Sequence, residues 1–183
     1  QMARLTDNML QLARLGTPGQ ALQLDWESAE EIVGGVLRRI RTRHPQARVR
    51  ARLDPALPLL QADAALLLQG LDNLVDNALK HGGPDPQVEL VARRVGDKLL
   101  LAVRDRGPGV PPAQRQRIFE LFQRGPAAAG RGSGVGLAVC RAIAQVHGAE
   151  LRCRARGHGG LAFELWLPLQ APPAGPAAEA ASA

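Results

Sequence analysis

The sequence predicts an α+β fold, a two-layer sandwich of helices against a mixed, mostly antiparallel sheet, preceded by one separate helix. Apolar residues recur at helical spacing in several blocks, which indicates helices with one buried face. Between these blocks lie paired runs in which apolar and polar residues alternate, as they do in half-buried strands. With 183 residues, of which 45% are hydrophobic, the chain also has enough apolar material for a core.

The elements follow one another between glycine and proline clusters. Ser28 is placed to cap a helix, and Gly82 to end the longest one. Gly96 and Asp97 join two alternating runs as a hairpin would. The expected helices cover 2–15, 29–42, 62–81, 112–122 and 134–147. The expected strands cover 22–26, 49–53, 87–95, 98–105, 150–155 and 161–167.

The charge of the chain raises the question of a nucleic-acid partner. The net charge is +6, and a basic surface attracts polyanions. However, only 3% of the residues are aromatic and none is tyrosine, so few rings are present to stack on bases. A non-catalytic nucleic-acid or anion-binding module remains one alternative; its arginines would be Arg38, Arg39, Arg41, Arg43, Arg48, Arg50 and Arg52. Because one helix end and one strand would spread these over several faces, we expect no nucleic-acid partner.

A polar stripe runs along the helix expected over 62–81. Asn73, Asn77, Lys80 and His81 fall within an arc of roughly 100° when drawn on a helical wheel. An asparagine carbonyl is a hard oxygen ligand that suits Mg²⁺, and a lysine one turn further on can reach a phosphate. By itself, such a stripe is more typical of a solvated helix face.

Two glycine-containing turns add to this stripe. Asp105 follows a strand directly, and its carboxylate can accept a hydrogen bond from an exocyclic amine while Gly107 and Gly109 let a flat base approach the backbone. The second turn opens the helix expected from residue 134, where free backbone N–H groups favour phosphate. Its glycines are Gly132, Gly134 and Gly136. No strand precedes them, so a dinucleotide-binding βαβ unit is not indicated.

Four stretches in order, LDNLVDNALKHGG, DRGPGV, IFELFQRG and GRGSGVGLAV, resemble the N, G1, F and G2 boxes of histidine-kinase ATP-binding domains. These domains belong to the Bergerat-fold superfamily, which also includes gyrase, Hsp90 and MutL. The resemblance covers residues 20–169 and implies that the chain binds ATP and Mg²⁺. Arg106 departs from the pattern, because asparagine is usual at that place in the G1 box.

The resemblance also implies a role for each matching residue. Asn77 would ligate Mg²⁺, Asp105 would bind the adenine amino group, and Asn73, Lys80 and His81 would line the phosphate and ribose side. Base-pocket, lid and phosphate contacts would come from Gly107, Gly109, Phe119, Phe122, Arg124, Arg131, Gly132, Gly134, Gly136 and Leu137.

The first seventeen residues resemble the second helix of a dimerisation and phosphotransfer hairpin, and residues 170–183 are expected to be a disordered tail. None of the four histidines, His44, His81, His147 and His158, stands in the context of a phosphoacceptor. The resemblance therefore implies a protein histidine kinase that phosphorylates a hairpin absent from this chain. Implied with it are a cognate response regulator, a homodimer in the intact kinase, and a cytosolic location next to a membrane anchor, without membrane contact by this part. Similarity is greatest to the potassium-responsive KdpD-type sensor kinases.

The resemblance leaves two reactions to consider. Superfamily members that hydrolyse ATP as conformational switches carry a glutamate one helical turn before the magnesium asparagine, where this chain has Asn73. Because an amide does not take up a proton as a carboxylate does, phosphoryl transfer to an external histidine is favoured over hydrolysis. Asp76 could polarise the acceptor imidazole or could pair with a neighbouring cation. Asn73, Asp76 and Lys80 are thus the candidate catalytic residues.

Overall fold

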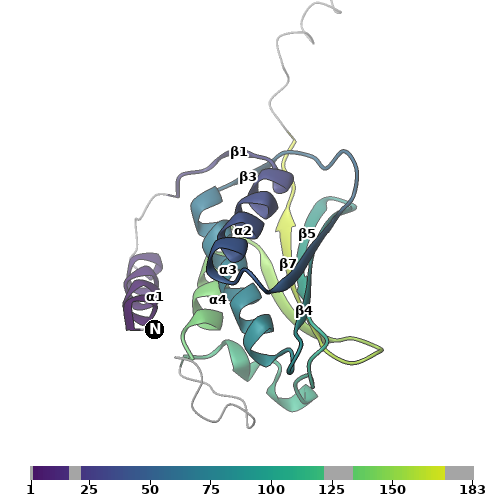
Figure 1. The fold of residues 1–183 in the computed structure, drawn as a ribbon. Coiled ribbons are helices and arrows are strands. Elements are labelled where there is room, and N and C mark those ends of the chain that lie inside the picture. Colours follow the sequence, from purple (N-terminus) through teal and green to yellow (C-terminus); the bar gives the residue numbers. More distant parts are fainter. Residues whose placement is uncertain (1, 17–21, 122–133, 172–183) are drawn as a thin grey trace, which may run out of the picture.

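A computed structural model describes residues 2–16, 22–121 and 134–171 of the chain (Figure 1). The helices are α1 (Met2–Leu15), α2 (Ala29–Arg43), α3 (Ala64–His81) and α4 (Gly136–Val146), with 3₁₀ turns η1 (Pro112–Gln114) and η2 (Arg117–Phe119). The strands are β1 (Asp25–Glu27), β2 (Arg48–Leu53), β3 (Leu60–Ala62), β4 (Gln87–Val95), β5 (Lys98–Arg104), β6 (Glu150–Ala155) and β7 (Leu161–Pro168).

Five strands form one sheet in the order β2-β4-β5-β7-β6, and helices lie on one side of it (Figure 1). Only the β2–β4 pair is parallel, while β4–β5, β5–β7 and β6–β7 are antiparallel. The short strands β1 and β3 pair separately. This is the predicted two-layer α+β sandwich, and the predicted fold class is confirmed.

Local chemistry explains where α2 and α3 begin. Ser28 accepts a hydrogen bond from the Glu31 amide, and Asp63 accepts one from the Leu66 amide, so each side chain satisfies an amide that the helix leaves free. Asp63 is held from a second side, because its own amide donates to Nε2 of His147 at 3.0 Å. His147, whose Nδ1 lies 2.8 Å from the carbonyl of Ile143, thereby ties the end of α4 to the start of α3.

The core lies between the helices and the sheet. Its largest fully buried side chains include Leu67, Leu71 and Leu74 of α3, which face Leu101 and Phe163 of the central strands. The hairpin of β4 and β5, whose residues pair from Glu89–Arg104 to Val95–Lys98, fixes one wall of this core. Burial of a continuous apolar stripe is thus what holds α3 in the centre of the helical layer.

Some boundaries differ from the expected ones. The helix expected over 112–122 is wrong for the described part of that segment, which forms two separate 3₁₀ turns. Consecutive prolines remove two amide donors at its start, and so short a segment does not recover the cost of nucleating an α-helix. The strand expected over 22–26 is observed at Asp25–Glu27, and its partner β3 was not predicted.

Several expectations lie outside the described residues. These concern the segment 122–133, with Phe122, Arg124, Arg131 and Gly132, and the tail beyond residue 171. Within the described ranges, none of the helices combines the length and the apolar character that a bilayer crossing requires.

Candidate functional site

Asp105 is a buried carboxylate held in one orientation by the backbone. Its side chain is 4% exposed, and Oδ1 accepts hydrogen bonds from the amides of Gly107 at 2.8 Å and Leu161 at 3.2 Å. Among the described residues, no donor bonds to its other oxygen, Oδ2. Because Oδ1 is occupied and the carboxylate is fixed, Oδ2 can serve as a preorganised acceptor for an amine of a ligand.

The turn after Asp105 packs directly on the end of α3. A Cβ added at Gly107 would overlap the carbonyl oxygen of His81, so only glycine permits this approach. Gly109 adopts a φ of 81°, a left-handed conformation that favours glycine as well. The structure thus brings the DRGPGV turn and the polar stripe of α3 together, although 24 residues separate His81 from Asp105.

The other end of the stripe meets the start of α4. Nδ2 of Asn73 lies 3.5 Å from the carbonyl oxygen of Gly136, and the Cβ position of Gly136 lies 3.8 Å from Cγ of Asn73. Helix α4 begins at Gly136 after Val135, which provides no side-chain cap, so its first amides keep their donor capacity. Nδ2 of Asn73 also lies 3.4 Å from Oδ1 of Asn8 on α1.

Asn77 and Lys80 continue the stripe between these two contacts. Asn77 is half-buried, and its side chain forms no hydrogen bond within the described part of the chain, while Lys80 is exposed. About eight residues of helix, roughly 12 Å, separate Asn73 from His81. The predicted residues therefore form one continuous line from α4 to Asp105, with an amide free for a metal ion in its middle.

The pKa of His81 is lowered at this site. Partial burial and the neighbouring Lys80 lower it, and the carboxylate of Asp105 opposes them. The imidazole is therefore neutral at pH 7, so it can accept a hydrogen bond as well as donate one.

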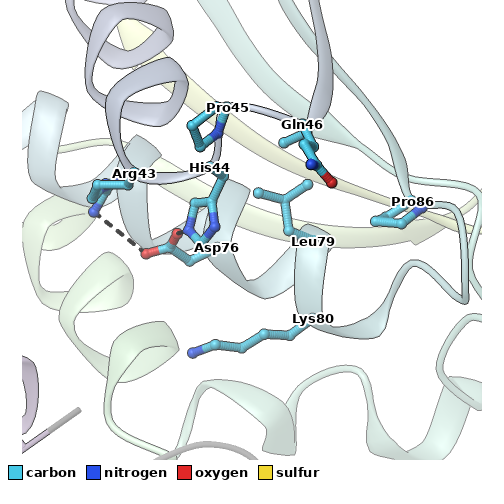
Figure 2. Close-up of a pocket in the computed structure, with 9 residues that line it drawn as sticks. Arg43, His44, Pro45, Gln46, Asp76, Leu79, Lys80 and Pro86 are labelled. Atoms are coloured by element: carbon cyan, nitrogen blue, oxygen red, sulfur yellow. Dashed lines mark ion pairs between the residues drawn. The ribbon is translucent and has the colours of Figure 1, made fainter.

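Asp76 borders this line, because it lies one helical turn before Lys80 on α3. It is 7% exposed, and its carboxylate oxygens lie 3.7 Å from Arg43 and 3.5 Å from Nε2 of His44. Figure 2 shows these contacts at the edge of a hollow of about 540 Å³ between the end of α2 and α3. Lys80 is one of the residues that line this hollow. Asp76 thus pairs with Arg43, a neighbouring cation of the kind expected for it. Its action on an acceptor imidazole stays a prediction.

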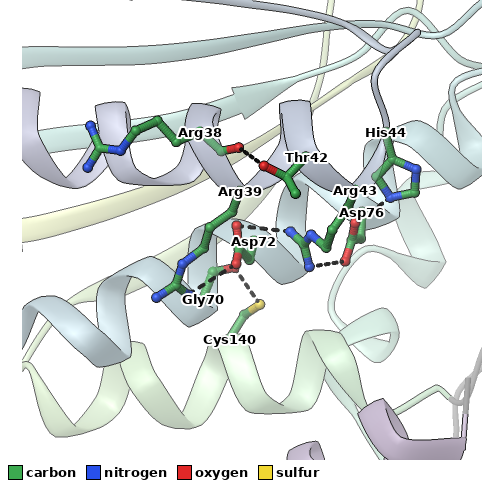
Figure 3. Close-up of polar contacts among 9 residues, drawn as sticks. All are labelled: Arg38, Arg39, Thr42, Arg43, His44, Gly70, Asp72, Asp76 and Cys140. Carbon is green, nitrogen blue, oxygen red and sulfur yellow. Dashed lines mark hydrogen bonds and ion pairs between the residues drawn. The ribbon is translucent and has the colours of Figure 1, made fainter.

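A second buried carboxylate belongs to the same network, which the sequence analysis missed. Asp72 forms ion pairs with Arg43, at 3.2 Å, and with Arg39, at 3.4 Å (Figure 3). Burial raises the pKa of Asp72, while both arginines lower it. The signal was present in the sequence, since aspartates spaced four apart interrupt an apolar helix and arginines spaced four apart end the preceding one.

The remaining predicted residues have structural surroundings of their own. Phe119 is 8% exposed and packs edge-on against Phe163, with ring centroids 6.0 Å apart, which anchors η2 to the core. Leu137 packs partly buried at the core edge, and Gly134 adopts a φ of 68° just before α4. No group of three or more His, Cys, Asp or Glu side chains in the described residues is placed to hold a metal ion. A metal ion bound here would depend on amide, phosphate and water oxygens.

A helix-backed mixed sheet, a fixed carboxylate beside a glycine turn and an amide-lined helix define the class of ATP-binding α/β sandwiches. The sequence comparison agrees, because residues 62–171 match the family model described as histidine kinase-, DNA gyrase B-, and HSP90-like ATPase. The chain belongs to this family.

Individual relatives are sensor histidine kinases. Sensor protein KdpD of Escherichia coli (strain K12) is 38% identical over 171 residues, which cover 93% of this chain and 19% of KdpD. Among solved structures, full-length ShkA in complex with AMPPNP superposes with a TM-score of 0.81 at 27% identity, over 94% of this chain and 37% of that one. Mycobacterial sensor histidine kinase MprB gives 0.71 at 27% identity, over 80% and 99%. The chain thus spans about a fifth of KdpD.

Proposed function

We propose that this chain binds Mg-ATP along α3 and donates the γ-phosphoryl group to a histidine on a phosphotransfer hairpin, as the catalytic part of a two-component sensor histidine kinase. The observation that carries the proposal is the environment of Asp105. Its carboxylate is buried, oriented by two backbone amides, and left with one oxygen toward which an adenine amino group can donate. The AMPPNP in the ShkA structure, an ATP analogue, supports the choice of nucleotide.

The phosphates would lie at the opposite end of the stripe. The uncapped start of α4 offers backbone amides and the positive end of the helix dipole, both of which favour an anion. Lys80 is exposed on the same stripe and can neutralise phosphate charge. We assign Arg124, Arg131 and Gly132 to the phosphates as well, by the resemblance alone.

Mg²⁺ fits the middle of the stripe. The ion usually keeps several waters and needs few protein oxygens in addition to those of the nucleotide phosphates. The carbonyl of Asn77 is half-buried and uncommitted to the described residues, so it is suited to be that ligand. Bound there, Mg²⁺ would neutralise charge on the phosphate oxygens during transfer.

Transfer to histidine is favoured over hydrolysis by the chemistry of Asn73. Its amide points its nitrogen at the carbonyl of Gly136, so the group acts as a donor at the start of α4. A donor in this position leaves no base to activate water. An ATP-hydrolysing switch is the less favoured reading for this reason.

The wider assignments rest on the relatives. We propose that residues 1–17 are the end of the phosphotransfer hairpin, that 20–169 are the ATP-binding domain and 170–183 a tail. The intact kinase would be a membrane-anchored homodimer whose cytosolic part phosphorylates a response regulator. The 38% identity to KdpD over nearly the whole chain favours potassium or osmotic signalling.

The test is phosphoryl transfer in a reconstituted system. The chain is mixed with Mg-ATP and a separately prepared phosphotransfer hairpin of the same kinase, and acid-labile phosphate on the hairpin is measured. We expect transfer by the wild type, its loss with Asn77→Ala, and its retention with Gln145→Ala, an exposed amide near the far end of α4. Transfer that survives Asn77→Ala would contradict the site, and failure to bind nucleotide would contradict the function.

A further inference from the structure

Arginines gather on the side of the sheet that faces away from the helices. Strand alternation places Arg50, Arg104 and Arg154 in one row across this face, with Glu89 between the first two. Arg52 and Arg152 lie in the next row of the same face, and Arg93 lies in the row after it. The helix arginines and the strand arginines of the basic segment 38–52 thus lie on different faces, as predicted. The strand arginines lie beside arginines that are distant in the sequence.

Four arginines converge at one end of this face. A hollow of about 190 Å³ is lined by Arg48, Arg50, Arg106 and Arg156, together with Gln87, Val88 and Glu89. Arg106 and Arg156 come just after the last paired residues of β5 and β6, so the starts of β2 and β4 and the segments after β5 and β6 supply the lining. The hollow is too small for a nucleotide and has the size of one small anionic group.

The positive charge of this hollow is poorly balanced. Arg48 pairs with Asp85 at 2.9 Å on the exposed surface, and Glu89 pairs with Arg104 at 3.4 Å. In the described part of the chain, no carboxylate forms an ion pair with Arg50, Arg106 or Arg156. Three guanidinium groups therefore line a small volume without an ion pair of their own, and Glu89, a carboxylate in the lining, is paired with Arg104.

One of these arginines is also fixed in place. Nη1 of Arg156 donates to the carbonyl oxygen of Asp105 at 2.7 Å, and the Arg156 amide donates to the carbonyl of Gly160 at 3.1 Å. A side chain at Gly160 would collide with the Asp105 carbonyl, so only glycine lets the two turns that carry Arg106 and Arg156 pack this closely. Guanidinium groups held in this way match the oxygens of a phosphate bidentately and lose little entropy on binding.

We propose that this hollow, the four-arginine site, binds a phosphate group. It lies on the outer face of the sheet with Arg50 and Glu89, whereas the candidate nucleotide site lies on the helical side, along α3. This placement gives a role to Arg106, the residue that departs from the usual G1 box. The site does not require that ATP binds the chain. Its phosphate is either that of a free phosphate compound or that of an anionic lipid headgroup.

The test uses inorganic pyrophosphate as the probe in calorimetric titrations of the whole chain. The variant Arg50→Ala/Arg106→Ala removes two lining arginines, and Arg52→Ala/Arg93→Ala removes two exposed arginines of the same face that do not line the hollow. Both variants lose the same charge. We expect the first pair to weaken binding by about tenfold or more and the second by about twofold or less, since close charge-assisted contacts outweigh screened ones.

Equal weakening of pyrophosphate binding in the two variants would overturn the proposal. It would show that the positive charge of the whole face attracts the probe without a specific site. Unchanged binding in Arg50→Ala/Arg106→Ala would overturn it too, because the probe would then occupy another place, such as the nucleotide site. Thermal unfolding of both variants checks that they fold. Sedimentation with phosphatidic acid vesicles, compared with phosphatidylcholine vesicles, identifies the source: retention that depends on Arg50 and Arg106 supports a headgroup, and pyrophosphate binding without retention supports a soluble phosphate.

Discussion

Arg43 joins two buried carboxylates, and its removal provides the sharpest test of how α2 is attached to α3. Its guanidinium lies 3.2 Å from Asp72 and 3.7 Å from Asp76, whose side chains are only 10% and 8% exposed. The change Arg43→Ala would leave two negative charges one helical turn apart in a poorly solvated place. Breaking a buried pair by removing one partner costs about 3–5 kcal/mol.

The cost expected for Arg43→Ala is smaller than this range, because the site is only partly shielded from solvent. The side chain of Arg43 is 32% exposed, and Arg39 also reaches Asp72, so solvent and a second cation screen the remaining charges. We therefore expect Arg43→Ala to lower the free energy of unfolding by about 2 kcal/mol and the melting temperature by about 4–8 °C.

The dependence on pH follows from the raised pKa of Asp72. In the folded state the carboxyl holds its proton more tightly than in the unfolded state, and without Arg43 it would hold it more tightly still. The cost of Arg43→Ala is therefore complete above the folded pKa and shrinks as the pH falls through it toward the ordinary value. Urea unfolding of the wild type and of Arg43→Ala, at neutral and at mildly acidic pH, measures the cost of the substitution and its decrease with falling pH.

The control is Arg41→Ala, an exposed arginine on the same helix, which should change the free energy of unfolding by less than about 0.5 kcal/mol. In the double variant Arg43→Ala/Asp72→Asn, part of the loss should be recovered, since one uncompensated charge is gone. The reasoning is refuted if Arg43→Ala costs no more than Arg41→Ala, or if the second change restores nothing.

Three further outcomes are expected. Asp105→Asn should weaken nucleotide binding by about ten- to a hundredfold in calorimetry, because the amide that replaces Oδ2 presents a donor to the adenine amino group; unchanged affinity would show that Asp105 does not contact the base. Gly107→Ala should lower the free energy of unfolding by about 1–3 kcal/mol, since its Cβ would overlap the His81 carbonyl. The control Gly157→Ala, at a position with open space around it, should have little effect, and equal losses in the two variants would contradict the close approach of Gly107 to His81. His147→Ala should cost about 1–2 kcal/mol in urea unfolding by leaving the Asp63 amide without its acceptor, and a neutral result would show that this contact does not stabilise the helix start.

Neither cysteine is expected to be a reactive thiol. Burial raises the pKa of Cys140 far above its usual range and that of Cys153 to about 11. Both are free, and Sγ of Cys140 donates to the carbonyl of Gly70 at 3.3 Å. This agrees with their treatment in the sequence as small apolar residues.

Periodicity and end signals were sufficient for most of the elements. Helix α3 was predicted from its apolar stripe and the glycines after it, and the β4–β5 hairpin from alternation around Gly96-Asp97. Each of these signals depends only on residues that lie close together in the sequence. Strand β3 was missed because prolines precede it and because only its pairing with β1, some 35 residues earlier, makes it a strand.

The sequence alone determined the residue types on the candidate site and, through four boxes in order, the family to which the chain belongs. Only the tertiary structure decided which of them meet: Gly107 on the carbonyl of His81, Asn73 on the start of α4, and Asp76 with Arg43 at the end of α2. It also decided that Arg106 and Arg156 share one hollow. The physical reason is that helical and strand periods fix the direction of each side chain within its own element, whereas burial of the common core fixes which elements become neighbours.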